Sequence, residues 1–107
     1  EAMEDRQLEL ALKQYSILTQ DEHATFEMFD GLVRTNLALS QTEEAYVQAR
    51  DAVQRWPKDA RTHELLGLAA QESGRTEEAK KSYQKALELN PYLVAAEEQL
   101  DALSTEE

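Results

Sequence analysis

The sequence predicts an all-α protein of about six helices that pair as antiparallel hairpins. Residues that favour helices, chiefly Ala, Leu, Glu, Gln, Lys and Arg, dominate the chain of 107 residues, which has only 3 Gly and 2 Pro. A four-residue segment, Thr42–Ala45, recurs as Thr76–Ala79, and the residues around both segments keep the same spacing of 34 residues. We therefore expect one repetitive domain, because a chain of this length rarely forms two.

The first predicted helix, about residues 5–19, has one apolar face that should pack on a helix over residues 26–39. This face consists of Leu8, Ala11, Leu12, Tyr15 and Leu18. A second stripe, formed by Met3, Leu10 and Ile17, is more than a terminal helix needs. It indicates a missing upstream helix, a bound partner or self-association, unless these residues are apolar side chains tolerated at the surface.

The next helices follow from their capping residues. A helix over about residues 25–39 precedes Ser40, which fits a capping box with Glu43, and Thr42 is the alternative cap. The helix that starts there should end before Trp56-Pro57. Trp56 is expected to staple the two hairpins together, and the alternative for it is a role in partner binding.

The second hairpin repeats this plan. Asp59 should cap a helix over residues 60–72, and Gly74 should end it in the left-handed conformation. Thr76 should cap a helix that runs to Leu89, before Pro91. The last helix, about residues 92–103, has one apolar stripe and a polar outer face, as in the capping helix of a solenoid.

Residues 60–93 resemble a tetratricopeptide repeat. Leu66, Gly67, Ala79, Tyr83, Ala86 and Pro91 match the family's pattern of apolar, small and aromatic positions, and residues 26–59 match more loosely through Leu32, Ala45, Ala52 and Pro57. The resemblance implies a right-handed superhelix of hairpins. Residues 4–21 would form the second helix of an incomplete repeat, residues 25–57 and 59–91 two repeats, and residues 92–104 a C-terminal capping helix. The residues expected to pack the repeats are Ala11, Tyr15, Leu32, Ala45, Ala52, Leu66, Gly67, Ala79, Tyr83 and Ala86.

The resemblance also implies a binding surface, since the first helix of each repeat in this family lines a groove that holds a peptide or a helix. The groove positions fall on Glu27, Asp30, Arg34, Leu37, Arg61, Glu64, Leu68 and Gln71. This mixture suits an amphipathic helix or a partly basic segment, and the alternative for each residue is a solvated helix surface. Some members clamp a terminal carboxylate with Lys, Asn and Arg, but Asp30 and Glu64 stand where Lys would help. We therefore expect no such clamp.

Composition argues against other classes of function. The net charge of −11 disfavours nucleic acids, whose phosphates need clustered Lys and Arg. No segment approaches the roughly 20 apolar residues of a membrane span, so we expect no membrane insertion. Neither His23 nor His63 accompanies a nucleophile or a metal motif, and the chain has no Cys. We expect no catalysis, cofactor or metal; the compartment stays open, with a soluble protein of the cytoplasm favoured.

The sequence thus predicts a non-catalytic scaffold that binds a protein or peptide partner. A self-association module that forms homo-oligomers through Met3, Leu10 and Ile17 is one alternative. A regulatory domain of a larger protein or enzyme is the other.

Overall fold

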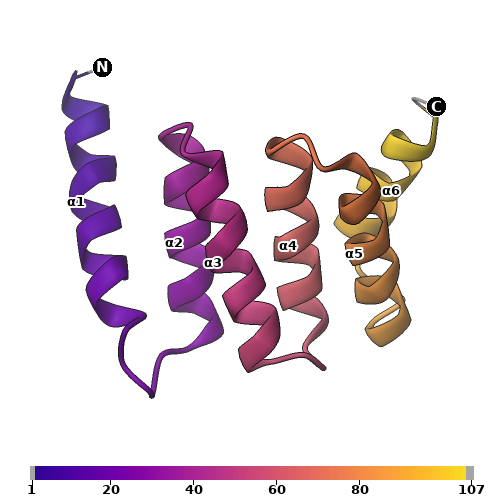
Figure 1. Ribbon diagram of the computed structural model, residues 1–107. Helices are drawn as coiled ribbons and strands as arrows, with labels where there is room; N and C mark the ends of the chain where they lie inside the picture. Colours follow the sequence, from indigo (N-terminus) through magenta and orange to yellow (C-terminus); the bar gives the residue numbers. More distant parts are fainter. Residues whose placement is uncertain (1, 106–107) are drawn as a thin grey trace.

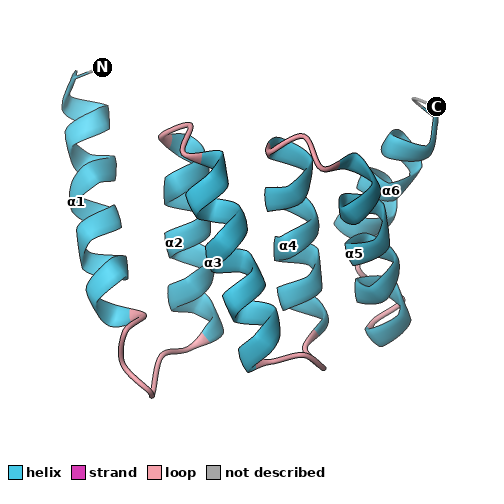
Figure 2. Cartoon of the chain, viewed as in Figure 1, coloured by secondary structure: helices cyan, strands magenta, loops and turns pink. Residues whose placement is uncertain are grey.

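The computed structural model describes residues 2–105, with side chains from residue 4 onward, and these residues form helices without any strand. Each helix packs on the next along the chain, and α2 also contacts α4. The helices follow one another in sequence order along a row (Figure 1), and the loops that join them lie alternately at the lower and the upper ends of the helices (Figure 2). This is the predicted all-α solenoid of hairpins. Its helices are α1 (Ala2–Leu18), α2 (Phe26–Ala38), α3 (Thr42–Arg55), α4 (Ala60–Glu72), α5 (Thr76–Leu89) and α6 (Val94–Thr105).

The two tight turns inside the hairpins share one backbone motif. Ser40 has a φ of 64° and Gly74 a φ of 83°, so both adopt the left-handed conformation after a helix. The backbone N–H of the following residue, Gln41 or Arg75, then donates to a carbonyl of the last helical turn, over 2.8 Å in both cases. This motif confirms the role predicted for Gly74.

The motif also explains two predictions that were wrong. Gln41 and Arg75 occupy the N-cap positions of α3 and α5, and neither side chain makes a capping hydrogen bond. Ser40 therefore does not start a capping box, and Thr76 is the first helical residue of α5. The prediction for Asp59 is confirmed, since its carboxylate accepts a hydrogen bond from the backbone N–H of Arg61 over 3.0 Å.

The crossing inside the second hairpin depends on a glycine. Gly67 of α4 lies against the ring of Tyr83 from α5, and a Cβ added to Gly67 would lie 2.8 Å from that ring. The matching positions of the first hairpin hold Val33 and Ala49, both fully buried in the same core cluster. The two hairpins thus fill equivalent crossings in opposite ways. The second hairpin has the small residue on its first helix and the large one on its second, and the first hairpin has the reverse.

Helix α1 packs on α2 by the same means, because a Cβ on Gly31 would overlap the ring of Tyr15. The predicted packing of Leu18 is wrong, since Leu18 is 43% exposed. Its counterparts Ala52 and Ala86 are fully buried. They lie on α3 and α5, and each of these helices is preceded by the first helix of its own hairpin. Among the described residues α1 has no such helix, which leaves this side of it open.

Polar and aromatic contacts join the two hairpins. The guanidinium of Arg75 lies 3.8 Å from the ring centroid of Tyr46, whose hydroxyl donates to Glu78 over 2.7 Å. The staple predicted for Trp56 was assigned to the wrong pair of elements. Its ring meets Phe29 of the same hairpin edge-on, with centroids 5.6 Å apart.

We expect Gly67→Val to destabilise the fold by about 1–3 kcal/mol, because the new side chain overpacks the crossing against Tyr83. Adding Tyr83→Ala should recover part of this loss, since the pair then imitates Val33 and Ala49. Urea unfolding of the two single variants and the double variant measures the coupling. Ala102→Val, at an exposed position of α6, serves as a control that introduces the same β-branched side chain into a helix away from any close crossing. Strictly additive effects of the two substitutions would contradict this account.

Candidate functional site

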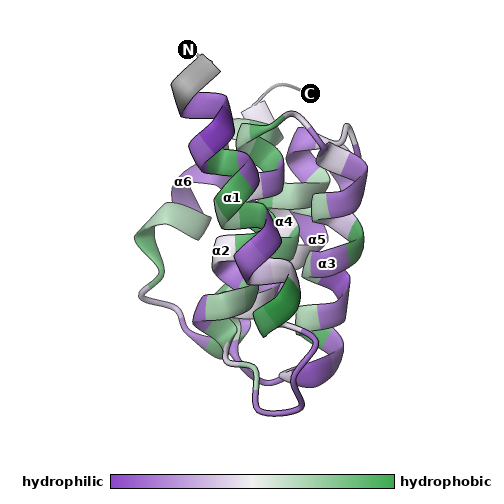
Figure 3. Cartoon of the chain, turned by 90° about the vertical axis from the view of Figure 1, so that its left-hand side faces the viewer, coloured by the Kyte–Doolittle hydropathy of each residue, from purple (hydrophilic) through white to green (hydrophobic). Residues whose placement is uncertain are grey.

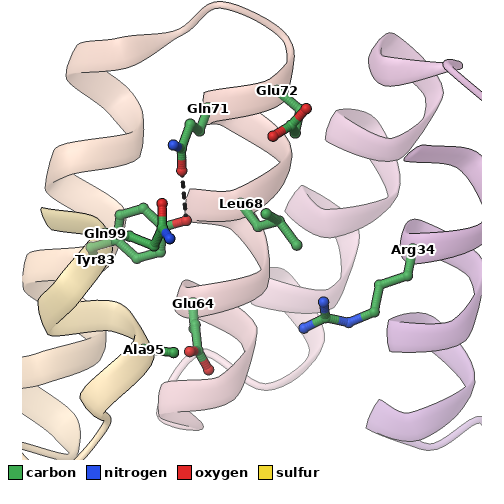
Figure 4. A pocket seen from close by; sticks show the side chains of 8 residues that line it. All are labelled: Arg34, Glu64, Leu68, Gln71, Glu72, Tyr83, Ala95 and Gln99. Carbon is green, nitrogen blue, oxygen red and sulfur yellow. Dashed lines mark hydrogen bonds between the residues drawn. The ribbon is translucent and has the colours of Figure 1, made fainter. Parts of the chain in front are cut away.

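A hollow of about 240 Å³ lies where α2, α4 and α6 face one another, with Tyr83 of α5 at its base. Figure 4 shows Leu68 at the middle of this hollow and the side chain of Arg34 reaching toward it from α2. Small-molecule sites usually enclose roughly 300–1,000 Å³, so this hollow suits side chains of a larger ligand better than a compact metabolite. Its lining residues are Arg34, Glu64, Leu68, Gln71, Glu72, Tyr83, Ala95 and Gln99.

Helix α4 supplies the central wall. Glu64, Leu68 and Glu72 are spaced by four residues, so they follow one face of the helix, with Leu68 between the two carboxylates. The small side of α4 at Gly67 lets Tyr83 approach closely, and the Tyr83 hydroxyl donates to Gln71 Oε1 over 3.0 Å. The fold therefore holds an apolar side chain between two acids, beside a fixed amide.

The electrostatic field in the hollow is negative. Arg34 Nε donates to Asp30 Oδ1 over 2.8 Å, so this cation is already matched by an acid of its own helix. Glu64 and Glu72, in contrast, form no ion pair with any side chain of residues 4–105. Burial, followed by the charges of Glu64 and Glu72, raises the pKa of Tyr83 to about 12, and the charge of Arg34 offsets this in part.

The predicted groove residues separate into two groups. Arg34, Glu64, Leu68 and Gln71 meet at the hollow. Glu27 and Arg61 lie outside it, and Arg61 Nη1 is 3.2 Å from Glu27 while Nη2 is 2.7 Å from Asp59. These hydrogen bonds, that of Asp59 first, raise the pKa of Arg61, whose guanidinium also lies 4.2 Å from the ring centroid of Phe26.

The remaining two predicted groove residues do not line the hollow either. Asp30 is the partner of Arg34, and Leu37 packs against the main hydrophobic cluster. The sequence interpretation missed four residues of the lining, namely Glu72, Tyr83, Ala95 and Gln99. Tyr83 was assigned to packing alone. Ala95 and Gln99 were missed because α6 was treated only as a cap, although the 34-residue register makes Ala95 the equivalent of the predicted groove residue Arg61.

The residues predicted to pack the repeats mostly lie in the core. Tyr83 is 1% exposed and Leu32 is 3% exposed, whereas Ala11 and Tyr15 on α1 are only half-buried. Leu66 and Gly67 are buried as well, and so are the four alanines Ala45, Ala52, Ala79 and Ala86.

The apolar stripe of α1 faces outward. Leu10 is 57% exposed and Ile17 is 62% exposed, while the side chain of Met3 lies outside the described residues. Figure 3 looks onto α1 and shows hydrophobic stretches of this helix on the near side.

Two further features bear on chemistry. Within the described residues, no group of three or more His, Asp or Glu side chains could hold a metal ion. No described helix combines the length and the apolar character needed to cross a bilayer.

Comparisons with known proteins agree with this architecture. A family model for the tetratricopeptide repeat matches residues 60–93. Anaphase-promoting complex subunit 7 of Arabidopsis thaliana is 37% identical over 79 residues, which cover 72% of this chain and 14% of that protein. The chain thus corresponds to a small part of this relative.

Solved structures show the same fold. The structure described as the first TPR of Spaghetti (RPAP3) bound to HSP90 peptide SRMEEVD superposes with a TM-score of 0.84 at 20% identity, over 97% of this chain and 82% of that one. MamA 41-end from Desulfovibrio magneticus RS-1 superposes with a TM-score of 0.81 at 22% identity, over 94% of this chain and 56% of that one.

Stacked antiparallel hairpins with a hollow on the side of their first helices define a helical-repeat solenoid. The matched repeat and the 34-residue register identify the kind of solenoid: residues 60–93 form a tetratricopeptide repeat, and the described residues have the fold of tetratricopeptide-repeat solenoids. Proteins of this family generally mediate protein–protein interactions and are typically scaffolds without catalytic activity.

We expect stability to fall between about pH 10 and pH 12 in a way that depends on Tyr83. The pKa of Tyr83 is raised in the folded state from an ordinary value of 10.0 to about 12, so the unfolded chain releases this proton first. The free energy of unfolding should then decrease as the pH rises through this range, by roughly 2 kcal/mol from Tyr83.

Tyr83→Phe should make that decrease shallower when unfolding is followed by urea titration at several pH values. Tyr92→Phe is the matched control, because Tyr92 is 86% exposed. Equal slopes for the wild type and Tyr83→Phe would show that the proton of Tyr83 is not held as described.

Proposed function

We propose that the chain is a non-catalytic interaction module that binds a peptide or helix of a partner protein on the side formed by α2, α4 and α6. The observation that carries this proposal is the hollow around Leu68, where a half-buried apolar side chain is bordered by polar groups. A binding surface commonly combines an apolar anchor site with a polar rim. Arg34, Glu64 and Gln71 supply that rim, and Leu68 supplies the anchor site.

The partner should be partly basic or amphipathic. The net charge of −11 attracts a cationic segment toward the chain. At short range, the carboxylates beside Leu68 attract the same segment. The division into an incomplete repeat over residues 4–21, repeats over 25–57 and 59–91, and a cap over 92–104 belongs to the same proposal, since it places the binding surface on the first helices.

Leu68→Asn should weaken partner binding at least about tenfold, because it replaces the apolar anchor with a polar side chain of similar size. Affinity purification from cell extract, followed by quantitative mass spectrometry, identifies the retained proteins, and titration of a purified partner gives the fold-change. Val47→Asn is the matched control, since Val47 is 61% exposed on α3, outside this hollow. Retention of every partner by Leu68→Asn would refute the assignment of the surface.

Self-association is a second candidate function, favoured by the exposure of Leu10 and Ile17 on α1. If these side chains join two copies, light scattering should show a mass that rises with concentration. Leu10→Glu should restore a monomer, because it places a charge in the apolar contact. A strict monomer at all concentrations, unchanged by Leu10→Glu, would remove this candidate.

A further inference from the structure

The hollow between α2, α4 and α6 has a charge pattern that goes beyond a general affinity for basic segments. Its two acids lie eight residues apart on α4, which separates them by about 12 Å along the helix axis, and Leu68 lies midway. One cationic side chain cannot contact both carboxylates at hydrogen-bond distance. The two acids therefore form two separate positions on either side of an apolar one.

The arginines nearby leave these positions negative. Arg34 is paired with Asp30, and Arg61 is paired with Asp59 and Glu27 and lies over Phe26. Gln71 Oε1 is already occupied by the hydroxyl of Tyr83. The negatively charged acceptors of the hollow, the carboxylates of Glu64 and Glu72, thus lack a charged partner within residues 4–105.

We infer that this surface recognises a partner segment in which an apolar residue is flanked by two basic residues, one opposite Glu64 and one opposite Glu72. The apolar residue packs on Leu68, and each basic side chain lays its methylene stem on the surface while its charge meets one carboxylate. The two charges must lie about 12 Å apart, which corresponds to four residues in an extended segment or about eight in a helix.

This pattern disfavours an acidic peptide. A segment such as SRMEEVD, named with the structural neighbour, carries three acids, and these would meet the carboxylates of Glu64 and Glu72 on this surface. The repulsion between the acids of the peptide and the acids of the surface would oppose binding. Selectivity between basic and acidic segments is therefore the property that separates this surface from one built for an acidic tail.

The inference rests on the proposed use of this side of the molecule, and a peptide selection tests it. Random linear peptides displayed on phage are selected against the immobilised chain, and the enriched sequences should contain two basic residues on either side of an apolar one. The strongest peptide is then titrated by fluorescence anisotropy. We expect the double variant Glu64→Gln with Glu72→Gln to bind this peptide about tenfold more weakly, because each substitution removes a charge and keeps the shape of the side chain.

Two controls make the result specific. Glu4→Gln with Glu9→Gln changes the net charge by the same amount on exposed positions of α1, and should alter binding by less than about twofold. Replacing one basic residue of the peptide by norleucine should weaken wild-type binding and remove the effect of the substitution at its partner acid. Such a pairwise dependence assigns each charge to one carboxylate.

The outcomes of these experiments test the inferred charge pattern separately from the proposed function on which it rests. Selected peptides that lack basic residues, or that bind Glu64→Gln with Glu72→Gln at full strength, would overturn the inference. If those peptides still lost binding with Leu68→Asn, the interaction module would stand. Peptides that bind Leu68→Asn as well as the wild type, or a selection that enriches no sequence, would overturn both.

Discussion

The close approach of paired helices is the constraint on which the structure depends. Two helices that touch along small side chains must share a limited volume, so a large residue on one requires a small residue on the other. Tyr83 is possible because α4 offers Gly67, and Val33 is possible because α3 offers Ala49. The same exchange holds α1 on α2 through Tyr15 and Gly31. This packing also affects the hollow. Because Tyr83 lies close to α4, its hydroxyl reaches Gln71, and both residues line the hollow.

Much of this fold could be predicted from local chemistry. Asp59 and Gly74 mark their helix ends because a single residue type is enough to predict a side-chain cap or a positive φ. The errors arose where a helix start is set by backbone geometry. Ser40 looked like a cap, but it serves as the left-handed residue that closes the preceding helix. The exposure of Leu18 could not be foreseen from its apolar character, because burial there depends on a neighbouring helix.

The candidate site was predictable only in part. The repeat register located four residues of the lining, because positions on the first helix of each unit recur every 34 residues. It could not show that Arg61 is held by Asp59 and Glu27, since ion pairing depends on side-chain reach between adjacent helices. Tyr83 was missed for a related reason. Its ring packs in the core while its hydroxyl reaches the surface hollow, and a pattern of residue types assigns a side chain one role only.

The contact between Arg61 and Glu27 links equivalent positions of successive first helices, and the next position in this register is Ala95. The wall between α2 and α4 is therefore braced by charge, whereas alanine offers α4 and α6 no such brace at that position. Ions in solution screen an exposed pair but leave apolar packing intact. Ionic strength consequently acts unequally on the two sides of the hollow: salt weakens the contact between Arg61 and Glu27, and at Ala95 there is no such pair for it to screen.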